Sequence, residues 1–489
     1  MRNKSRSRGK AMQSILSNPW IIGIIGGALS AIIAGIVLYY LFEYRKEEAQ
    51  KNIRLNTIRQ AYTLLQKGMP KDALEHYQNL SEQVSYEKEP LIYRRIYDMM
   101  GVCYARLALK NNKEENFNKA IQCYQGALRT NAVDVDYART HTNLANAYKG
   151  LSEIRDKKTN LIKSIQSCEQ ALKVYSKDKF PEEYSAVNIN LGNAYEGLSG
   201  IRDQLVNLTK ALSAYQEALK TVRQDNYYEH AKIQNNIGLV FRNLAIISNK
   251  KENAINAIQA FEDSLKIFTV EKYPVEYAVS KNNIAGCYRI LSDIQDKETN
   301  LVRSIKACEE ALAIFKAEEY PVRYANVLHN LGEAYCYLSE VRDAEANLKK
   351  AVSSFEEALR FRRIDKYPLD FAMTEYSMAI AYGKLSALQK KRENLNKSIQ
   401  ASEEALKVYT NNKYPVKYAL TKNNIGFTYT LLASIENKEK NLLKAIEAYK
   451  VALQAVSSEQ YSDQFTGIFN NFQIASDTLN KMRQGNSKH

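Results

Sequence analysis

Asparagine is the residue type whose spacing most suggests chemistry in this chain of 489 residues. One asparagine recurs every 46 or 47 residues, and the row is broken only at Ser377. Its members are Asn143, Asn190, Asn236, Asn283, Asn330, Asn424 and Asn471. A carboxamide has both donors and an acceptor, so it can bind the main chain of an extended peptide without reading side chains. Because amides also bond neighbouring helices, two interpretations stay open: a binding surface, or links that hold a stack of helices together.

Residue patterns typical of catalysis or metal binding are missing from the sequence. It contains no G-x-x-x-x-G-K-[ST] phosphate loop and no H-E-x-x-H metal-binding helix. The five histidines lack ligand spacing, and the six cysteines include no C-x-x-C pair. We therefore expect no cofactor, no metal and no enzymatic activity, and a function that depends on binding.

A row of basic residues repeats with a similar period. Its members are Lys119, Lys163, Lys210, Arg303, Lys350, Lys397 and Lys444. A solvated face of mixed charge explains such a row, and a track for an anionic polymer is the alternative. The formal net charge is +15, but no block of like charge stands out, so nucleic acid is not an expected partner.

Apolar periodicity indicates which elements position these rows. Tyr277, Ile284 and Tyr288 follow the period of an α-helix and therefore share one helical face. A second apolar stripe follows over residues 301–315, so each unit is predicted to be two amphipathic helices joined by a short turn. An asparagine at each second-helix start is expected to be the N-cap, whose side chain accepts a bond from a free backbone N–H. These residues are Asn116, Asn160, Asn207, Asn253, Asn300, Asn347, Asn394 and Asn441.

The motifs within these units resemble those of the tetratricopeptide repeat (TPR) family. Leu191-Gly192-x2-Tyr195 matches the first part of the family pattern, and Ala211-x3-Tyr215 matches the second part. The family unit has about 34 residues, whereas the spacing here is mostly 46 or 47 residues. Kinesin light chains have a similarly lengthened unit with an Asn-Asn-Leu-Ala string, which the segment 282–285 resembles.

The resemblance implies an all-α fold over about residues 55–482: a right-handed superhelical solenoid of helix-turn-helix repeats. In TPR proteins the first helix of each repeat lines a concave groove, so the asparagine row is expected to face that groove. Pro274, Pro321, Pro368 and Pro415 are expected in the first turn of the next helix, where the missing N–H costs nothing. The implied partners are other proteins or peptides, and the implied function is a scaffold or receptor.

The chain is predicted to divide into six parts. These are a basic tail (1–19), a transmembrane helix (20–42), a juxtamembrane helix with a short TPR-like unit (43–87), eight long TPR-like repeats (88–461), a capping helix (462–482) and a polar tail (483–489).

The segment 20–42 is uncharged and, at about 1.5 Å per residue, long enough for a hydrocarbon core of roughly 30 Å. A single-pass membrane protein with this bilayer contact is therefore expected; a cleaved signal peptide is the alternative. Basic residues flank the segment equally. Acidic residues at 43, 47 and 48 favour an inside N-terminus, which would place the solenoid outside the cytoplasm.

Small residues recur every four positions in the same segment, at Gly23, Gly27, Ala31 and Gly35. Such a ridge allows a second helix to approach closely, so a homo-oligomer is a further hypothesis. A self-assembling structural membrane protein without a groove ligand, or a binder of an anionic polymer, is therefore the alternative to a scaffold.

Overall fold

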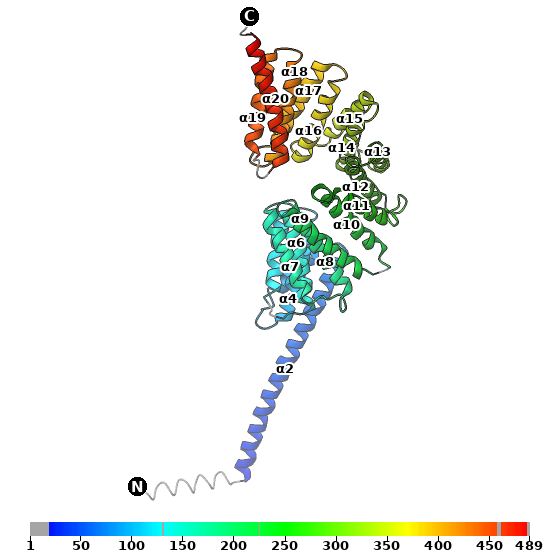
Figure 1. Cartoon of the computed structure of the whole chain (residues 1–489). Coiled ribbons are helices and arrows are strands. Elements are labelled where there is room, and N and C mark those ends of the chain that lie inside the picture. Colours follow the sequence, from blue (N-terminus) through cyan, green and yellow to red (C-terminus); the bar gives the residue numbers. More distant parts are fainter. Residues whose placement is uncertain (1–18, 130–131, 224, 457–460, 487–489) are drawn as a thin grey trace, which may run out of the picture. The chain divides into compact units, whose positions relative to one another are not determined.

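The computed structural model describes residues 19–129, 132–223, 225–456 and 461–486, and every regular element in these ranges is an α-helix (Figure 1). The all-α repeat fold expected from the sequence is thus confirmed for the described residues. The chain divides into two compact units, Met1–Ser176 and Lys177–His489.

The first unit begins with the long helix α2 (Pro19–Gln66), whose C-terminal end packs against α3 (Pro70–Ser81) through buried Ile58, Ala61 and Leu65. The N-terminal part of α2 extends away from the other helices of this unit (Figure 1). Two helix pairs follow, each packed against the next. They are α4 (Pro90–Ala108) with α5 (Lys113–Ala127), and α6 (Val135–Ser152) with α7 (Lys157–Leu172).

The second unit continues the same arrangement. Its pairs are α8 (Pro181–Ser199) with α9 (Gln204–Thr221), α10 (Tyr227–Ile247) with α11 (Lys250–Leu265), α12 (Pro274–Ser292) with α13 (Lys297–Ile314), α14 (Pro321–Leu338) with α15 (Ala344–Leu359), α16 (Pro368–Leu385) with α17 (Lys391–Leu406), and α18 (Pro415–Ala433) with α19 (Lys438–Ala455). A last helix, α20 (Ser462–Asn486), packs against α18 and α19. First helices of successive pairs contact one another from α10 to α18, which makes them a continuous layer.

Helix starts follow two rules. Pro274, Pro321, Pro368 and Pro415 occupy the first turn of α12, α14, α16 and α18, as predicted. Second helices instead begin after a residue in the left-handed region, with φ between 42° and 47°. These residues are Asn112, Asp156, Asp203, Asn249, Asp296, Asp343, Lys390 and Asn437.

The predicted role of the asparagine near each second-helix start is therefore wrong. Asn347, for example, is the fourth residue of α15 rather than its N-cap, which is Asp343. Its Nδ2 donates to the carbonyl of Arg342 at 2.8 Å, so the amide donates to the turn instead of accepting from the helix. All eight asparagines make the same bond to the residue five positions earlier, at 2.7–3.0 Å. The helices begin one turn earlier than expected because a residue in the left-handed conformation precedes each of them, and in seven of the eight repeats this is Asn or Asp, which tolerate it.

Helix α2 also contains the segment predicted to cross a membrane. Residues 20–34 lie outside the part of α2 whose side chains are described. Among the described residues no helix is long and apolar enough to cross a bilayer. This finding contradicts the predicted single-pass membrane localisation and the topology derived from it.

The predicted small-residue ridge falls mostly on the same segment. Gly23, Gly27 and Ala31 lie outside the described side chains. At Gly35, a Cβ atom would have no heavy atom within 4 Å. A homo-oligomer formed through this ridge stays an untested prediction.

Candidate functional site

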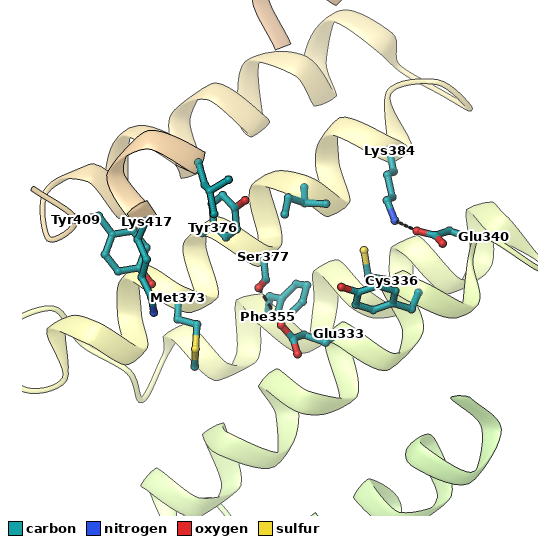
Figure 2. Close-up of a pocket in the computed structure, with 13 residues that line it drawn as sticks. Glu333, Cys336, Glu340, Phe355, Met373, Tyr376, Ser377, Lys384, Tyr409 and Lys417 are labelled. Atoms are coloured by element: carbon teal, nitrogen blue, oxygen red, sulfur yellow. Dashed lines mark hydrogen bonds and ion pairs between the residues drawn. The ribbon is translucent and has the colours of Figure 1, made fainter. Parts of the chain in front are cut away.

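A cavity of about 500 Å³ lies along the first helices α14, α16 and α18 of the second unit (Figure 2). Side chains from three successive repeats line it. They are Glu333, Cys336, Tyr337 and Glu340 of α14, Phe355 of α15, Met373, Tyr376, Ser377, Ile380 and Lys384 of α16, Tyr409 after α17, and Lys417 and Leu420 of α18.

The helical period explains why α16 contributes most of this wall. Met373, Ser377, Ile380 and Lys384 are separated by four, three and four residues, so they share one face of the helix. The corresponding face of α14 contributes Glu333, and Phe355 of α15 lies behind it (Figure 2). The cavity therefore runs across repeats rather than within one.

A cluster of ion pairs lies at one end of the cavity (Figure 2). Glu340 accepts hydrogen bonds from Lys384 of the cavity wall and from Lys297, which starts α13. Burial alone would raise the pKa of Glu340, but the two ammonium groups lower it below its ordinary value. Lys384 also lies over the ring of Tyr337, at 5.7 Å from the centroid. This end therefore combines aromatic surface with paired charges.

The middle of the cavity contains a second paired carboxylate. Glu333 lies 3.3 Å from Arg289 and 3.7 Å from Nε2 of His329, and Ser377 donates to it at 3.5 Å. Complete burial of His329 lowers the pKa of that imidazole to about 4, and the Glu333 charge offsets this only in part. His329 is therefore neutral at pH 7, and the charge partner of Glu333 is Arg289.

The other end of the cavity presents a cation without a counter-charge. Lys417 has no carboxylate within ion-pair distance among the described residues, and its Nζ lies 5.2 Å from the centroid of Tyr409. Burial lowers the pKa of Lys417, although Asp370 acts in the opposite direction. Of the charged groups described in this wall, the Lys417 ammonium is thus the one that a ligand could pair.

The predicted asparagine row does not line this cavity. Asn330 donates to Asn282 Oδ1 at 2.8 Å, and Asn471 donates to Asn423 Oδ1 at 3.0 Å. The first bond joins α14 to α12, which are the first helices of neighbouring repeats, and the second joins α20 to α18. These amides therefore connect the stack of helices. Only Ser377, the exception in the row, is part of the wall.

The other asparagines have different surroundings. Asn283 accepts from Arg242 of the preceding repeat at 2.8 Å, and Asn424 donates to Ser402 of α17 at 3.0 Å. Asn143 lines a separate cavity in the first unit. Asn190 and Asn236 make no side-chain hydrogen bond to any described residue and are partly exposed. The structure does not gather the seven into one site, and ligand binding by them stays a prediction.

The row of basic residues pairs with aromatic rings. In each repeat concerned, the cation of the second helix lies 4.9–5.7 Å from the ring centroid of a tyrosine in the first helix of the same pair. The pairs are Tyr104–Lys119, Tyr148–Lys163, Tyr195–Lys210, Tyr288–Arg303, Tyr335–Lys350, Tyr382–Lys397 and Tyr429–Lys444. Where Phe241 replaces the tyrosine, Asn256 replaces the cation. This pairing gives the row a role inside each repeat.

Sequence reasoning missed the cavity residues Tyr376 and Lys417. The signal that could have located Tyr376 is the interruption of the asparagine row at the adjacent Ser377. A position that departs from an otherwise constant pattern marks the repeat whose surface differs. Lys417 had no such signal, because its isolation from carboxylates depends on how α16, α17 and α18 pack.

Comparison with known proteins agrees with this repeat architecture. A tetratricopeptide repeat family model matches residues 325–361, which cover most of α14 and α15. The predicted TPR character is thereby confirmed for this part of the chain. No curated protein matches. The likeness to the repeat type of kinesin light chains stays a prediction.

Solved structures with similar helical arrangements share little sequence with this chain. The C-terminal part of a TPR repeat-containing protein from Cytophaga hutchinsonii is 15% identical, with 66% of this chain and 98% of that chain covered and a TM-score of 0.36. A Rap protein complexed with competence and sporulation factor is 15% identical, with 78% and 98% covered and a TM-score of 0.38. A STAND protein with a TPR sensor from Pyrococcus horikoshii is 15% identical, with 78% and 57% covered and a TM-score of 0.38.

Proposed function

We propose that this chain is a protein-interaction scaffold that holds a segment of a partner protein along the first helices α14, α16 and α18. The observation that supports this most strongly is the cavity of about 500 Å³ whose walls come from three successive repeats. Ligand sites in proteins usually have about 300–1,000 Å³. A cavity built across repeats suits an elongated ligand, because neighbouring parts of that ligand meet neighbouring repeats.

The composition of the walls suits a protein segment. Tyr337, Tyr376 and Tyr409 combine large apolar faces with a polar edge, and Met373 and Ile380 add apolar surface between them. Aromatic residues of this kind contribute most of the binding free energy at protein interfaces. Met373 is unbranched and flexible, so it can adapt to the shape of a bound side chain. We therefore infer that apolar side chains of the partner enter the cavity.

The carboxylates of the cavity are better suited to structure than to proton transfer. Glu340 is held ionised by two lysines, and Glu333 is held by Arg289 and Ser377. A general acid needs a carboxyl group whose pKa is raised toward neutral pH, whereas the pKa of Glu340 is lowered. This arrangement favours binding over catalysis at the cavity.

The amides of Asn190 and Asn236 are additional candidates for contact with the partner. Both lie on first helices of the second unit and have no hydrogen-bond partner among the described residues. An amide of this kind can bind a main-chain N–H or C=O group. The bonded amides of Asn330 and Asn471 instead support a stacking role for those two positions.

Site-specific photo-crosslinking tests the proposal. The photoreactive residue p-benzoylphenylalanine replaces Tyr376 in the cavity, and in a matched control it replaces Tyr227, which is 61% exposed at the start of α10. We expect partner proteins to be captured from position 376 and not from position 227, as identified by mass spectrometry.

A cavity-filling variant completes the test. Ser377→Trp should abolish the capture from position 376 while circular dichroism and the melting temperature stay near those of the parent chain. Equal capture from positions 376 and 227, or capture that survives Ser377→Trp in a folded protein, would show that the partner binds elsewhere.

A further inference from the structure

A second cavity, of about 530 Å³, lies in the first unit between the end of α2 and the helices α3, α4 and α6. It belongs to a different compact unit from the cavity described above and shares no residue with it. Its walls bring together two aspartates, three arginines and a patch of apolar side chains. The proposed function does not use this cavity.

Two polar atoms in the wall are buried without a partner among the described residues. Asp98 is 1% exposed, and its Oδ1 makes no hydrogen bond, while its Oδ2 accepts from Arg139 Nε at 3.4 Å. Tyr77 is fully buried, and its hydroxyl group also has no partner. Buried polar groups are nearly always bonded, and leaving one unbonded costs about 1–3 kcal/mol. A ligand with a donor group would satisfy Asp98 Oδ1.

Two of the three arginines in the same wall have no carboxylate partner among the described residues. Arg139 is already engaged by Asp98 and by Asp136, the latter at 2.8 Å. Arg106 donates from Nη1 to the main-chain carbonyl of Leu65 at 2.6 Å and meets no carboxylate among the described residues. Arg95 likewise has no carboxylate partner in the described part of the chain. Since Arg95 and Arg106 retain unpaired positive charge, they would favour an anionic group on the ligand.

The unbonded Asp98 oxygen and the two unpaired arginines together favour a ligand that has both a donor group and an anionic group. A purely anionic ligand would leave Asp98 Oδ1 unsatisfied, and a purely cationic ligand would be repelled by Arg95 and Arg106. A zwitterion satisfies both ends. Ile58, Met99 and Val102 supply an apolar surface for the remainder of the molecule.

We propose that this cavity binds a free α-amino acid with an apolar side chain, its ammonium group on Asp98 and its carboxylate on Arg95 and Arg106. The Tyr77 hydroxyl group provides a further hydrogen bond. Asp98 Oδ1 and the Tyr77 hydroxyl are covered by neighbouring side chains, so binding requires a rotamer change.

Isothermal titration calorimetry of the full chain with L-leucine tests the proposal. L-Leucinamide, which lacks the carboxylate, and N-acetyl-L-leucine, which lacks the ammonium group, are the matched probes. We expect saturable binding of L-leucine, with weakening of about tenfold or more for each probe because each loses one charged contact. Absence of binding for millimolar L-leucine, L-methionine and L-phenylalanine would overturn the proposal, and so would equal binding of leucine and leucinamide.

Two variants and one control variant locate the site. Arg95→Met changes an exposed residue, so it should fold, and we expect it to weaken L-leucine binding about tenfold. Asp98→Asn should abolish binding, with the melting temperature as the check on folding. Lys417→Met, in the other cavity, should leave leucine binding unchanged. Unchanged binding in Arg95→Met would contradict the assigned carboxylate contact, whatever the outcome for Asp98→Asn.

Discussion

Gly332 of α14 lies against the ring of Phe355 of α15, and a Cβ atom at position 332 would lie only 2.6 Å from Cε1 of that ring. The same two positions can be compared in all eight helix pairs, because their spacing along the chain is constant. Glycine faces an aromatic ring in five of them: Gly101–Tyr124, Gly192–Tyr215, Gly238–Phe261, Gly332–Phe355 and Gly426–Tyr449. Alanine stands opposite a small residue at the same positions in the other three: Ala145–Cys168, Ala285–Cys308 and Ala379–Ser402. The buried Cys168 and Cys308 are thus explained by the space available to them.

This size relationship predicts that the effect of Gly332→Ala on the free energy of unfolding changes sign when Phe355 is replaced by a small residue. Gly332→Ala should destabilise the chain by about 1–3 kcal/mol, because the added methyl group meets the ring of Phe355. In a Phe355→Cys background the same substitution should stabilise by up to about 1 kcal/mol, because alanine favours the helix and fills vacated space. Urea denaturation of the four proteins measures the difference.

Gly286 provides the matched control for this cycle. It lies within α12, and the nearest atom to a Cβ there is Arg242 Cδ, at 3.8 Å. Gly286→Ala should therefore be neutral or stabilising. Equal destabilisation at positions 286 and 332 would contradict the steric explanation.

Lys390 predicts a stabilising substitution. It has φ of 42°, a region that costs a non-glycine residue about 1 kcal/mol. Lys390→Gly should raise the free energy of unfolding by up to about 1 kcal/mol, whereas Lys391→Gly, at the first residue of α17 where φ is not positive, should lower it slightly. Chemical denaturation of the two variants measures this free energy at two adjacent lysines. A change of the same sign in both variants would contradict the prediction.

Glu375 predicts a pH-dependent effect on stability. Burial raises the pKa of this carboxyl group to about 7, with Glu404 adding to the effect and Lys407 opposing it. Between pH 4.5 and 7 the unfolded chain loses the proton while the folded chain keeps it, so this group's contribution to stability falls as pH rises. The difference corresponds to about 3 kcal/mol at most.

Glu375→Gln should therefore stabilise the chain at pH 8 and have little effect at pH 4.5. The measurement is the free energy of unfolding of variant and wild type at each pH. His329 acts in the opposite direction, since its pKa of about 4 means that stability is lost as pH falls from 6.5 to 4. Because His329 is present in both proteins, the difference in unfolding free energy between variant and wild type isolates the contribution of Glu375. Glu403→Gln, on an exposed face of α17, is the control, and an equal effect there would contradict the assignment.

The two interpretations of the asparagine row make separable predictions. Asn330→Ala removes the bond to Asn282 and should cost about 1 kcal/mol of stability. Asn190→Ala breaks no bond among the described residues and should leave stability unchanged or slightly raised, because alanine favours the helix. If Asn190→Ala weakens capture of the crosslinked partner without loss of stability, this amide binds the ligand. Unchanged capture would leave Asn190 without a binding role.

The sequence predicted the helical repeat correctly because the apolar period and the proline positions are local signals. It failed at the second-helix starts because Asn347 and its equivalents look like caps, while the turn depends on the residue four positions earlier. The cavity could not be predicted in detail, since Tyr376 and Lys417 meet only after three repeats have packed. The predicted membrane span rested on length and hydropathy alone, and the described part of α2 does not support it.

The match of sizes between the first and second helix of each unit also limits how this repeat array can be rearranged. Each matched pair lies within one helix-turn-helix unit, so duplication or deletion of whole units keeps both partners together. A crossover between the two helices of a unit would instead combine a glycine with a cysteine, which leaves a void, or an alanine with a phenylalanine, which clashes. Chimaeras joined after a second helix should therefore fold, whereas those joined at the turn before it should fold only when the exchanged units are of the same kind.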